Sequence, residues 1–345
     1  MILKHILIIR LSAMGDVAMT VPIIMALQQQ HPNVKITYVS RPFFKPFFSE
    51  INNVSFFEVD LKARHSGFLG IFKLFFDLKK LKIDAVADLH NVLRSKILRF
   101  LFVLTGKKVA HTNKGRADKK ALVRSKNKIF KPLKTMFSRH LETFSLLGFD
   151  INLEQLKFAE KAVLSNNLKN VIRFDEKDIL VGIAPFAQYK SKVYDADLMQ
   201  KVIDDLALNT NYKMLLFGGG TTEIEQLNDF AQNKNNVIVI AGKCNLAEEL
   251  QLISNLKVML SMDSANAHMA AMLGVKVITL WGATHPFAGF APFNQPPDNC
   301  LVSDRKLYPM LPTSVYGNKI VPNYQAVMRT IAPKKVVEAI NAVLA

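Results

Sequence analysis

The chain has 345 residues, half of them apolar, and a formal net charge of +17. This length predicts two domains, and the apolar content excludes a mainly disordered protein. Two cysteines, Cys244 and Cys300, are too few for a disulfide framework or a four-cysteine metal site and indicate a reducing compartment. Nowhere do 18 uncharged apolar residues run together, and Arg10 and Asp16 interrupt the apolar N-terminal stretch, so we expect a soluble, cytoplasmic protein.

The first half of the chain alternates short β-branched runs with segments of helical spacing. Strands are predicted at Ile6–Ile9, Val34–Val39, Val54–Val59 and Ala85–Leu89, and helices at Val17–Gln30, Phe68–Leu81, Ser95–Leu104 and His140–Leu147. The polar, basic segment Lys107–Lys134 is weakly periodic and is predicted to be an ordered loop or a mobile flap. A crossing between domains is expected within Asp150–Asp178.

The second half repeats the alternation. Strands are predicted at Ile179–Ala184, Lys213–Phe217, Val237–Ile240, Val258–Ser261 and Val277–Trp281, and helices at Asp197–Leu208, Glu223–Gln232, Leu246–Asn255, Ala265–Leu273 and Pro333–Leu344. Pro292–Pro322 is rich in loop residues. The pattern predicts two doubly wound parallel sheets of similar size, with ligands at the carboxyl ends of the strands and a common cleft between the two sheets. We expect one lobe at residues 1–165, a second at 175–325 and a terminal helix within 326–345.

The positive charge is concentrated in one part of the chain. Between Asp60 and His140 there are 21 Lys/Arg against 5 Asp/Glu, a local charge of 21 − 5 = +16. Such a basic lobe suggests a polyanionic partner: nucleic acid, an anionic membrane surface or a phosphorylated substrate. The alternative is a solvated face that aids solubility. Nucleic acid is the weakest option, because the basic segment has no interleaved aromatic residues and no known binding motif.

Gly15 and Asp16 lie at the predicted turn from the first strand into the first helix. Gly15 permits close approach of a ligand, and the helix dipole favours an ionised Asp16. An ordinary N-cap aspartate is the alternative, and a catalytic role needs support from elsewhere in the chain.

Three segments of the second half offer that support. Lys192 lies in a polar loop where it could hold an anion, although a plain surface lysine is equally compatible with the pattern. The glycine turn that includes Gly218 and Gly219 follows a strand, with Glu223 opening the next helix. It is neither a G-x-G-x-x-G fingerprint nor a P-loop, so neither an NAD site nor a P-loop is predicted.

The densest group of polar residues follows the strand Val258–Ser261. Asp263, Ser264 and Ala265 lead into a helix that contains His268, and Thr284 follows the next strand. Backbone N–H groups at such a helix start bind anions. Asp263 as an N-cap and His268 as a core histidine are the alternatives. No His/Cys pair has metal-ligand spacing, and neither a metal nor a cofactor is expected.

These stretches resemble the family 9 glycosyltransferases, the ADP-heptose:lipopolysaccharide heptosyltransferases, over nearly the full length. The resemblance is carried by ILIIRLSAMGDVAMTVPIIMAL (Ile6–Leu27), DLHNVLRS (Asp88–Ser95), LLFGGGTTE (Leu215–Glu223) and SMDSANAHMAAMLGVKVITLWGATHP (Ser261–Pro286). It implies the GT-B fold, with two Rossmann-like lobes that bind donor nucleotide on the second and acceptor on the first.

The resemblance also implies roles for individual residues. Asp16 matches a carboxylate that acts as general base on the acceptor hydroxyl, and Lys192 matches a lysine at the donor phosphate. Glu223 resembles an acid near the ribose, Asp263 and His268 match the D-[ST]-G-x-x-H motif around the donor sugar and diphosphate, and Thr284 matches a residue near the phosphates. Ala265 departs from the motif glycine, and His90 from a common acceptor-side glutamine, which leaves the identity of the donor sugar open.

The implied activity is an inverting, metal-independent transfer of heptose from ADP-heptose to a phosphorylated glycolipid of the lipid A–Kdo type. The implied location is peripheral, at the inner membrane. Candidate contacts to the acceptor or the anionic membrane surface are the basic residues Lys62, Arg64, Arg94, Lys114, Arg116 and Arg124. The alternatives are transfer of another nucleotide sugar and a catalytically silent relative that binds a nucleotide sugar.

Overall fold

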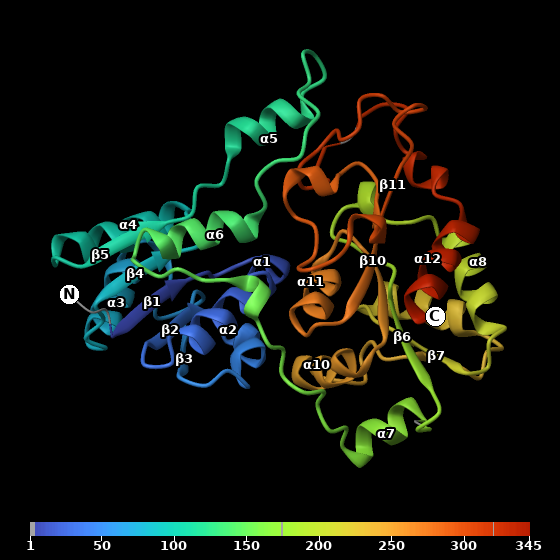
Figure 1. Ribbon diagram of the computed structural model, residues 1–345, viewed down its shortest axis with the longest axis horizontal. Helices are drawn as coiled ribbons and strands as arrows, with labels where there is room; N and C mark the ends of the chain where they lie inside the picture. Colours follow the sequence, from blue (N-terminus) through green and yellow to red (C-terminus); the bar gives the residue numbers. More distant parts are fainter. Residues whose placement is uncertain (1–3, 174, 320) are drawn as a thin grey trace. The chain divides into compact units, whose positions relative to one another are not determined.

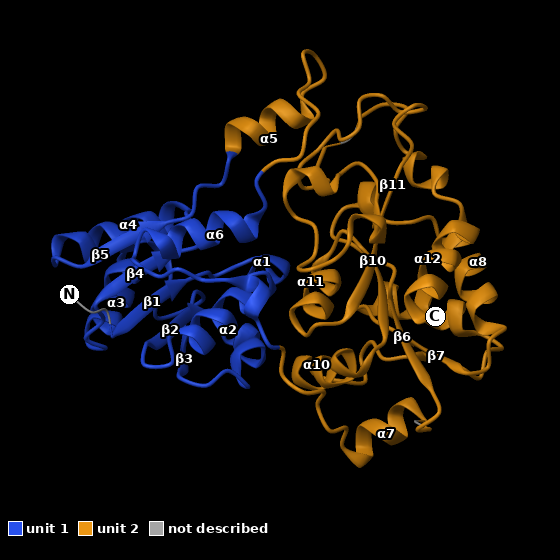
Figure 2. Cartoon of the chain, viewed as in Figure 1, with its two compact units in different colours: residues 1–115, 134–157 blue, residues 116–133, 158–345 orange. Residues whose placement is uncertain are grey.

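The computed structural model describes residues 4–173, 175–319 and 321–345. The chain forms two compact units, shown in different colours in Figure 2. The first comprises residues 1–115 and 134–157, and the second comprises residues 116–133 and 158–345. Each contains its own parallel sheet, with the strands and helices labelled in Figure 1.

The first unit is built on a five-stranded parallel sheet in the order β3-β2-β1-β4-β5. Its strands are β1 (His5–Ile9), β2 (Lys35–Ser40), β3 (Val54–Glu58), β4 (Ala85–Asp88) and β5 (Lys108–His111). Its helices are α1 (Met14–Ala18), α2 (Val21–Gln30), α3 (Gly67–Lys79), α4 (Leu93–Leu104) and α6 (Met136–Ser145), with short 3₁₀ turns η1 (Pro42–Phe48) and η2 (Leu153–Gln155). The central strand β1 is buried between β2 and β4 and is apolar from Ile6 to Ile9, as a parallel sheet covered on both faces requires.

The predicted helix Val17–Gln30 is two helices in the structure. The helical conformation is interrupted between Ala18, where α1 ends, and Val21, where α2 begins. Pro22 has no N–H to donate to the carbonyl four residues earlier, so a continuous helix would lose a hydrogen bond there. The Thr20 hydroxyl instead donates to the Val17 carbonyl at 2.7 Å. The short α1 therefore presents Asp16 separately from the longer α2.

The second unit is built on a six-stranded parallel sheet in the order β11-β10-β9-β6-β7-β8. Its strands are β6 (Ile179–Ala184), β7 (Tyr212–Leu216), β8 (Val237–Val239), β9 (Val258–Met262), β10 (Lys276–Trp281) and β11 (Cys300–Val302). Its helices are α5 (Arg116–Val123), α7 (Asn166–Ile172), α8 (Ala196–Ala207), α9 (Thr221–Ala231), α10 (Leu246–Asn255), α11 (Ala265–Met272) and α12 (Pro333–Leu344), with 3₁₀ turns η3 (Lys190–Lys192), η4 (Pro286–Ala288), η5 (Pro297–Asn299) and η6 (Val327–Thr330). The terminal helix α12 buries Val336 and Ile340 in the same core as α8.

The basic segment Lys107–Lys134, predicted as a loop or flap, contains strand β5 and helix α5. The expected first lobe of residues 1–165 included all of this segment, but residues 116–133 pack with the second unit. Lys128 donates to the Pro312 carbonyl at 2.7 Å, and the Leu133 N–H donates to the Phe287 carbonyl at 2.9 Å. These contacts make α5 and the residues after it part of the second unit, although unit-1 segments flank them in the sequence.

None of the helices among the described residues is long and apolar enough to span a bilayer.

Candidate active site

The carboxylate of Asp16 lies just beyond the carboxyl end of β1, as the third residue of α1. It pairs with the Arg10 guanidinium at 2.5 Å and accepts the Ala13 N–H at 3.3 Å. The Arg10 side chain is almost completely buried, whereas 31% of the Asp16 side chain is exposed. The carboxylate is therefore held by a buried arginine and remains partly exposed to solvent.

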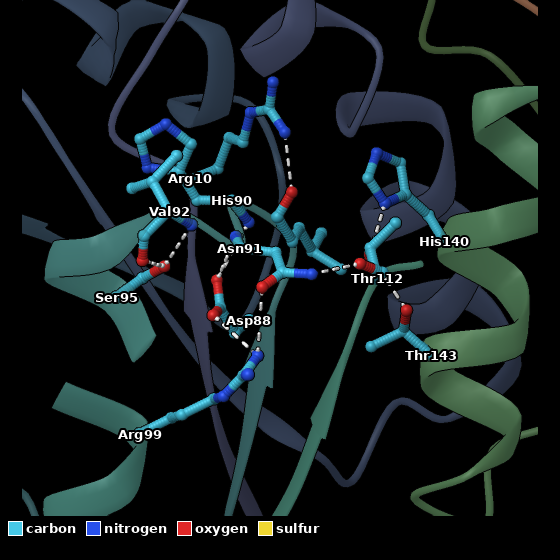
Figure 3. A network of polar contacts seen from close by, with 11 residues as sticks. Arg10, Asp88, His90, Asn91, Val92, Ser95, Arg99, Thr112, His140 and Thr143 are labelled. Atoms are coloured by element: carbon cyan, nitrogen blue, oxygen red, sulfur yellow. Dashed lines mark hydrogen bonds and ion pairs between the residues drawn. The ribbon is translucent and has the colours of Figure 1, made fainter. Parts of the chain in front are cut away.

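Arg10 is held in turn by the ends of two neighbouring strands. Its guanidinium donates to the Leu89 carbonyl, which follows β4, at 2.6 Å (Figure 3). Its own carbonyl accepts from the Ser40 hydroxyl at the end of β2, also at 2.6 Å. Sequence reasoning noted Arg10 only as a charge that ends an apolar run. A cation directly after a buried strand and six residues before an aspartate was the available signal.

A polar network fixes the chain that follows β4 (Figure 3). The completely buried Asp88 carboxylate accepts the N–H groups of His90 and Asn91 at 3.0 and 2.7 Å and pairs with Arg99 at 3.2 Å. The Asn91 amide donates to the Thr112 carbonyl at 2.9 Å, which ties this turn to the end of β5. The network thus orients the loop that carries His90.

His90 lies beside the turn that leads to Asp16. Its Nε2 is 3.4 Å from the Ser12 hydroxyl. Burial, followed by the nearby charges of Arg10 and Lys114, lowers the pKa of His90 to about 3. The imidazole is therefore neutral at pH 7 and can act there as a hydrogen-bonding group, not as a cation.

A mostly apolar cavity of about 620 Å³ opens beside α1 in the same unit. It is lined by Met14, Arg41, Pro42, Phe43, Phe44, Val59, Asp60, Leu61 and Lys62. Arg41 is anchored by donating to the Leu11 carbonyl at 3.0 Å. The cavity combines apolar walls with two cations, and the oxygens of its one carboxylate, Asp60, accept the backbone N–H groups of residues 62, 63 and 64. The net positive lining suits an amphiphilic anion.

In the second unit, Lys192, Asp263 and Thr284 meet although they come from three separate loops. Lys192 Nζ lies 3.1 Å from Asp263 Oδ2, and the Thr284 hydroxyl donates to the same oxygen at 2.8 Å. All three side chains are largely buried. Asp263 precedes α11 without capping it, and its carboxylate instead holds the lysine and the hydroxyl together.

Glycines let these loops approach one another closely. A Cβ on Gly282 would lie 2.4 Å from the Ser191 carbonyl oxygen, and a Cβ on Gly317 would lie 2.6 Å from the Lys192 side chain. The next N–H, of Ala283, donates to the same Ser191 carbonyl at 3.0 Å. The loop after β10 therefore supports the loop that carries Lys192.

The start of α11 adjoins Asp263. Ser264 is the N-cap residue but makes no capping bond to the helix, and its hydroxyl lies 3.0 Å from that of Ser261. Ala265 is the first helical residue, and His268 is buried within the helix. An N-terminus without a side-chain cap suits an anion, which would accept hydrogen bonds from the first N–H groups.

The glycine turn after β7 is held by Glu223. Its carboxylate accepts the Gly219 N–H at 2.8 Å, and a Cβ on Gly218 would lie 3.1 Å from the same carboxylate. Gly220 has a φ of +81°, which favours glycine. In this structure Glu223 therefore stabilises the turn.

Residues 71–325 match the model of glycosyltransferase family 9 (heptosyltransferase). The chain belongs to this family.

The lipopolysaccharide core heptosyltransferase OpsX of Haemophilus influenzae is 26% identical over 84% of this chain and 82% of its own length. A family 9 glycosyl transferase from Veillonella parvula superposes with a TM-score of 0.74 at 19% identity, over 99% of this chain and 97% of its own. The E. coli heptosyltransferase WaaC with ADP gives a TM-score of 0.66 at 19% identity, over 98% and 97% of the two chains. The two Rossmann-like units are those of the GT-B fold, as the sequence predicted, and the chain is a glycosyltransferase.

The basic residues singled out from the sequence lie on both units. Lys62, Arg64, Arg94 and Lys114 belong to the first unit, and Arg116 and Arg124 to the second. Three of the guanidinium groups are engaged within the chain: Arg64 with Asp77 at 2.8 Å, Arg94 with the His65 carbonyl at 2.7 Å and Arg124 with the Asn127 carbonyl at 2.5 Å. Lys62 is exposed and lines the cavity beside α1.

The described residues contain no cluster of three or more His, Cys, Asp or Glu side chains that could hold a metal ion. Asp195 and Asp197, which resemble a D-x-D pair in the sequence, bind Arg329 at 3.7 and 2.8 Å.

Proposed function

We propose that this family 9 enzyme moves heptose from ADP-heptose to the lipopolysaccharide inner core, on an acceptor of the lipid A–Kdo type. Transfer inverts the anomeric centre and uses no metal, with Asp16 as the general base. The observation that carries the proposal is the environment of Asp16, a partly exposed carboxylate fixed by a buried arginine. Membership of the heptosyltransferase family and the likeness to OpsX support the choice of substrates.

In the proposed reaction Asp16 accepts the proton of the acceptor hydroxyl while that oxygen attacks the anomeric carbon of the heptose. The bond from the anomeric carbon to the diphosphate breaks, and its electron pair leaves with ADP. General base catalysis of this kind contributes roughly 10²–10⁴ in rate. The Arg10 ion pair supports this role, because it fixes the orientation of the carboxylate.

Lys192 and the first N–H groups of α11 would stabilise the negative charge that develops on the leaving diphosphate. Lys192 is paired with Asp263 at 3.1 Å, so a bound diphosphate would take over part of that partnership. Asp263 and His268 would then face the donor sugar, and Thr284 the phosphates. Gly15 allows the acceptor to approach α1, and Gly218, Gly219 and Glu223 form the turn proposed to lie at the ribose.

The acceptor would be a phosphorylated glycolipid at the inner membrane. Lys62, in the cavity beside α1, is the best placed of the basic candidates for contact with it. We propose that the enzyme works at the cytoplasmic face of this membrane as a peripheral protein. The net charge of +17 supports attraction to an anionic surface.

One departure from the family motif supports a second candidate. Ala265 replaces the motif glycine at the first position of α11, where a side chain narrows the space for a donor sugar. Transfer of a different sugar is therefore the second candidate, and a catalytically silent nucleotide-sugar binder is the third.

Incubation of the purified protein with a panel of nucleotide sugars and deacylated core acceptor separates these candidates. Release of ADP from ADP-heptose alone is the expected result. Nucleoside diphosphate release from another donor would move the assignment to that sugar. Binding of a donor without release in the presence of acceptor would contradict an enzymatic role.

A further inference from the structure

The outer faces of α3 and α4 carry an unusual concentration of exposed apolar side chains. Fifteen large apolar residues are exposed in the described chain, and seven of them lie on these two helices, which have 13 + 12 = 25 residues. The helices pack side by side in the first unit, where Phe75 and Phe102 meet edge to face with ring centroids 5.0 Å apart (Figure 1). The exposed residues therefore lie on two neighbouring helices of one unit, and their surface is called here the α3–α4 face.

Helical spacing places the exposed residues of each helix together. On α3, Phe68, Phe72 and Phe76 follow one another at intervals of four, and the rings of Phe68 and Phe72 are in edge contact at 5.3 Å. Leu69 lies beside them and is 74% exposed. The opposite side of α3 is the one buried in the core, through Leu74 and other apolar residues. The three phenylalanines are therefore not part of the hydrophobic core of the first unit.

The second helix repeats this arrangement. On α4, Leu93, Phe100 and Leu104 are each more than half exposed, at spacings that place them on one side of the helix. Leu98 and Phe102 face the core. Exposed apolar side chains concentrated on neighbouring helices in this way mark an interaction site.

The charges around the α3–α4 face are positive. Lys73 and Lys79 on α3, Lys80 at its C-cap and Lys96 on α4 are exposed. Asp77 is the one acid in the sequence of the two helices, and it is largely buried and paired with Arg64 at 2.8 Å. Two copies of this face would bring like charges together, which disfavours self-association. A partner with an apolar interior and an anionic surface complements both features.

We propose that the α3–α4 face docks on an anionic lipid bilayer, with its phenylalanines and leucines entering the interface and its lysines contacting the headgroups. This inference rests on the proposed function for the choice of partner, since a lipid-linked acceptor brings the enzyme to a membrane. It assigns the docking to an amphipathic pair of helices, separate from the basic segment that contains α5. Insertion of an apolar helix face together with lysine attraction is a known physical basis of interfacial binding.

Vesicle binding by three variants of the full-length protein tests this proposal. The face variant Phe68→Ser/Phe76→Ser/Phe100→Ser removes apolar groups and leaves every charge in place. The control variant Leu146→Ser/Val163→Ser/Leu208→Ser removes apolar groups elsewhere that are even more exposed. The charge variant Lys73→Gln/Lys96→Gln leaves the apolar groups in place. Because all these side chains are exposed, melting temperatures within a few degrees of wild type are expected.

Binding is measured by co-sedimentation with phosphatidylcholine vesicles, with and without phosphatidylglycerol. The face variant should bind the anionic vesicles at least about tenfold more weakly than wild type, and the control variant within about twofold of it. The charge variant should lose about tenfold on anionic vesicles alone. Equal binding by the face variant and wild type would overturn the proposal, as would failure of wild type to bind.

Two further measurements separate this inference from its alternatives. Turnover of ADP-heptose with soluble deacylated acceptor should be the same in the face variant and wild type, and absence of turnover in both would count against the proposed function without affecting docking. Sedimentation velocity should show the same oligomeric state for both proteins. Dissociation of a dimer by the face variant would assign the face to a second copy of the chain and overturn membrane docking.

Discussion

Arg10 contributes to the proposed chemistry through the position of Asp16. It is almost completely buried, and it joins the Asp16 carboxylate to the Leu89 carbonyl at the end of the neighbouring strand. A rigid support of this kind is what a general base needs, because a displacement of about 1 Å can cost roughly 10²-fold in rate. Arg10 is therefore a positioning residue in this account.

We expect Arg10→Met to lower kcat by about 10- to 100-fold and to leave the affinity for ADP-heptose within about threefold of wild type. Arg10→Lys should recover part of kcat, because it restores a charge but not the two-pronged geometry. Steady-state kinetics, donor titration and melting curves check this. Wild-type kcat in Arg10→Met would contradict the positioning role, and a proportionate loss of kcat and donor affinity would indicate a purely structural one.

The Lys192–Asp263 ion pair of the second unit resembles the Arg10–Asp16 pair of the first, because each joins a carboxylate of the candidate site to a cation. Both side chains are nearly buried, and such a pair is stable only while each charge keeps a partner. In the proposed reaction, a diphosphate at Lys192 would replace Asp263 without leaving the lysine unpaired. The Thr284 hydroxyl, 2.8 Å from the carboxylate, gives Asp263 a remaining partner.

At the scale of elements, the candidate-site loops of the second unit depend on close approach between backbone segments. At Gly282, directly after β10, a Cβ atom would clash with the Ser191 carbonyl oxygen at 2.4 Å. At Gly219, after β7, a Cβ atom would meet no other atom within 4 Å. Substitution of each glycine by alanine therefore compares a position where a methyl group clashes with one where it does not.

Gly282→Ala should destabilise the protein by about 1–3 kcal/mol, because the new methyl group forces the loop that carries Lys192 to move. Donor affinity should fall with it. Gly219→Ala should change the free energy of unfolding by less than about 0.5 kcal/mol. Urea denaturation and nucleotide titration measure both effects, and equal stability of the two variants would contradict the packing argument.

The sequence predicted the strand–helix alternation well, because buried parallel strands such as Ile179–Ala184 are continuous apolar runs. It failed where tertiary contacts override the pattern. β5 and β11 are edge strands of four and three residues. They are too short to show the continuous apolar run by which the longer strands were recognised in the sequence. α5 is strongly charged, and the contacts that hold its segment come from residues far along the chain, such as Pro312.

The candidate site was predicted in part for the same reasons. Asp263 and Thr284 were recognisable because each follows a strand of one sheet, and the structure brings them together with Lys192. Arg10 was missed because a cation after a strand is a weak signal by itself, and its contacts with Asp16 and the Leu89 carbonyl become visible only in the fold.

At the scale of the whole molecule, the basic region is divided between the two units. Seven of the 21 Lys/Arg residues between positions 60 and 140 lie in residues 116–133, which pack with the second unit. Some of these side chains are structural: Lys128 donates to two carbonyls, and burial, together with Arg305, lowers its pKa to about 8. The number of cations available to bind a polyanion is therefore smaller than the net charge suggests.

Phe130 anchors this segment within the second unit. Its ring lies under the Arg305 guanidinium at 3.4 Å and contacts His285 and Phe287 at 5.1 and 4.9 Å between centroids. Phe130→Ala should raise hydrogen exchange about tenfold or more in residues 116–133 and 284–290, and leave β1 to β4 unchanged. Ile129→Ala, at the exposed neighbouring position, is the control. Faster exchange confined to the first unit's sheet would contradict the division into units.

The most direct test of the whole account is the turnover of Asp16→Asn, with Asp229→Asn on the exposed side of α9 as an isosteric control. Single-turnover transfer from ADP-heptose is measured beside donor affinity. We predict a loss of roughly 10²–10⁴ in rate for Asp16→Asn, donor affinity within about threefold of wild type, and no change in the control. Transfer by Asp16→Asn at a rate close to that of wild type would contradict the account.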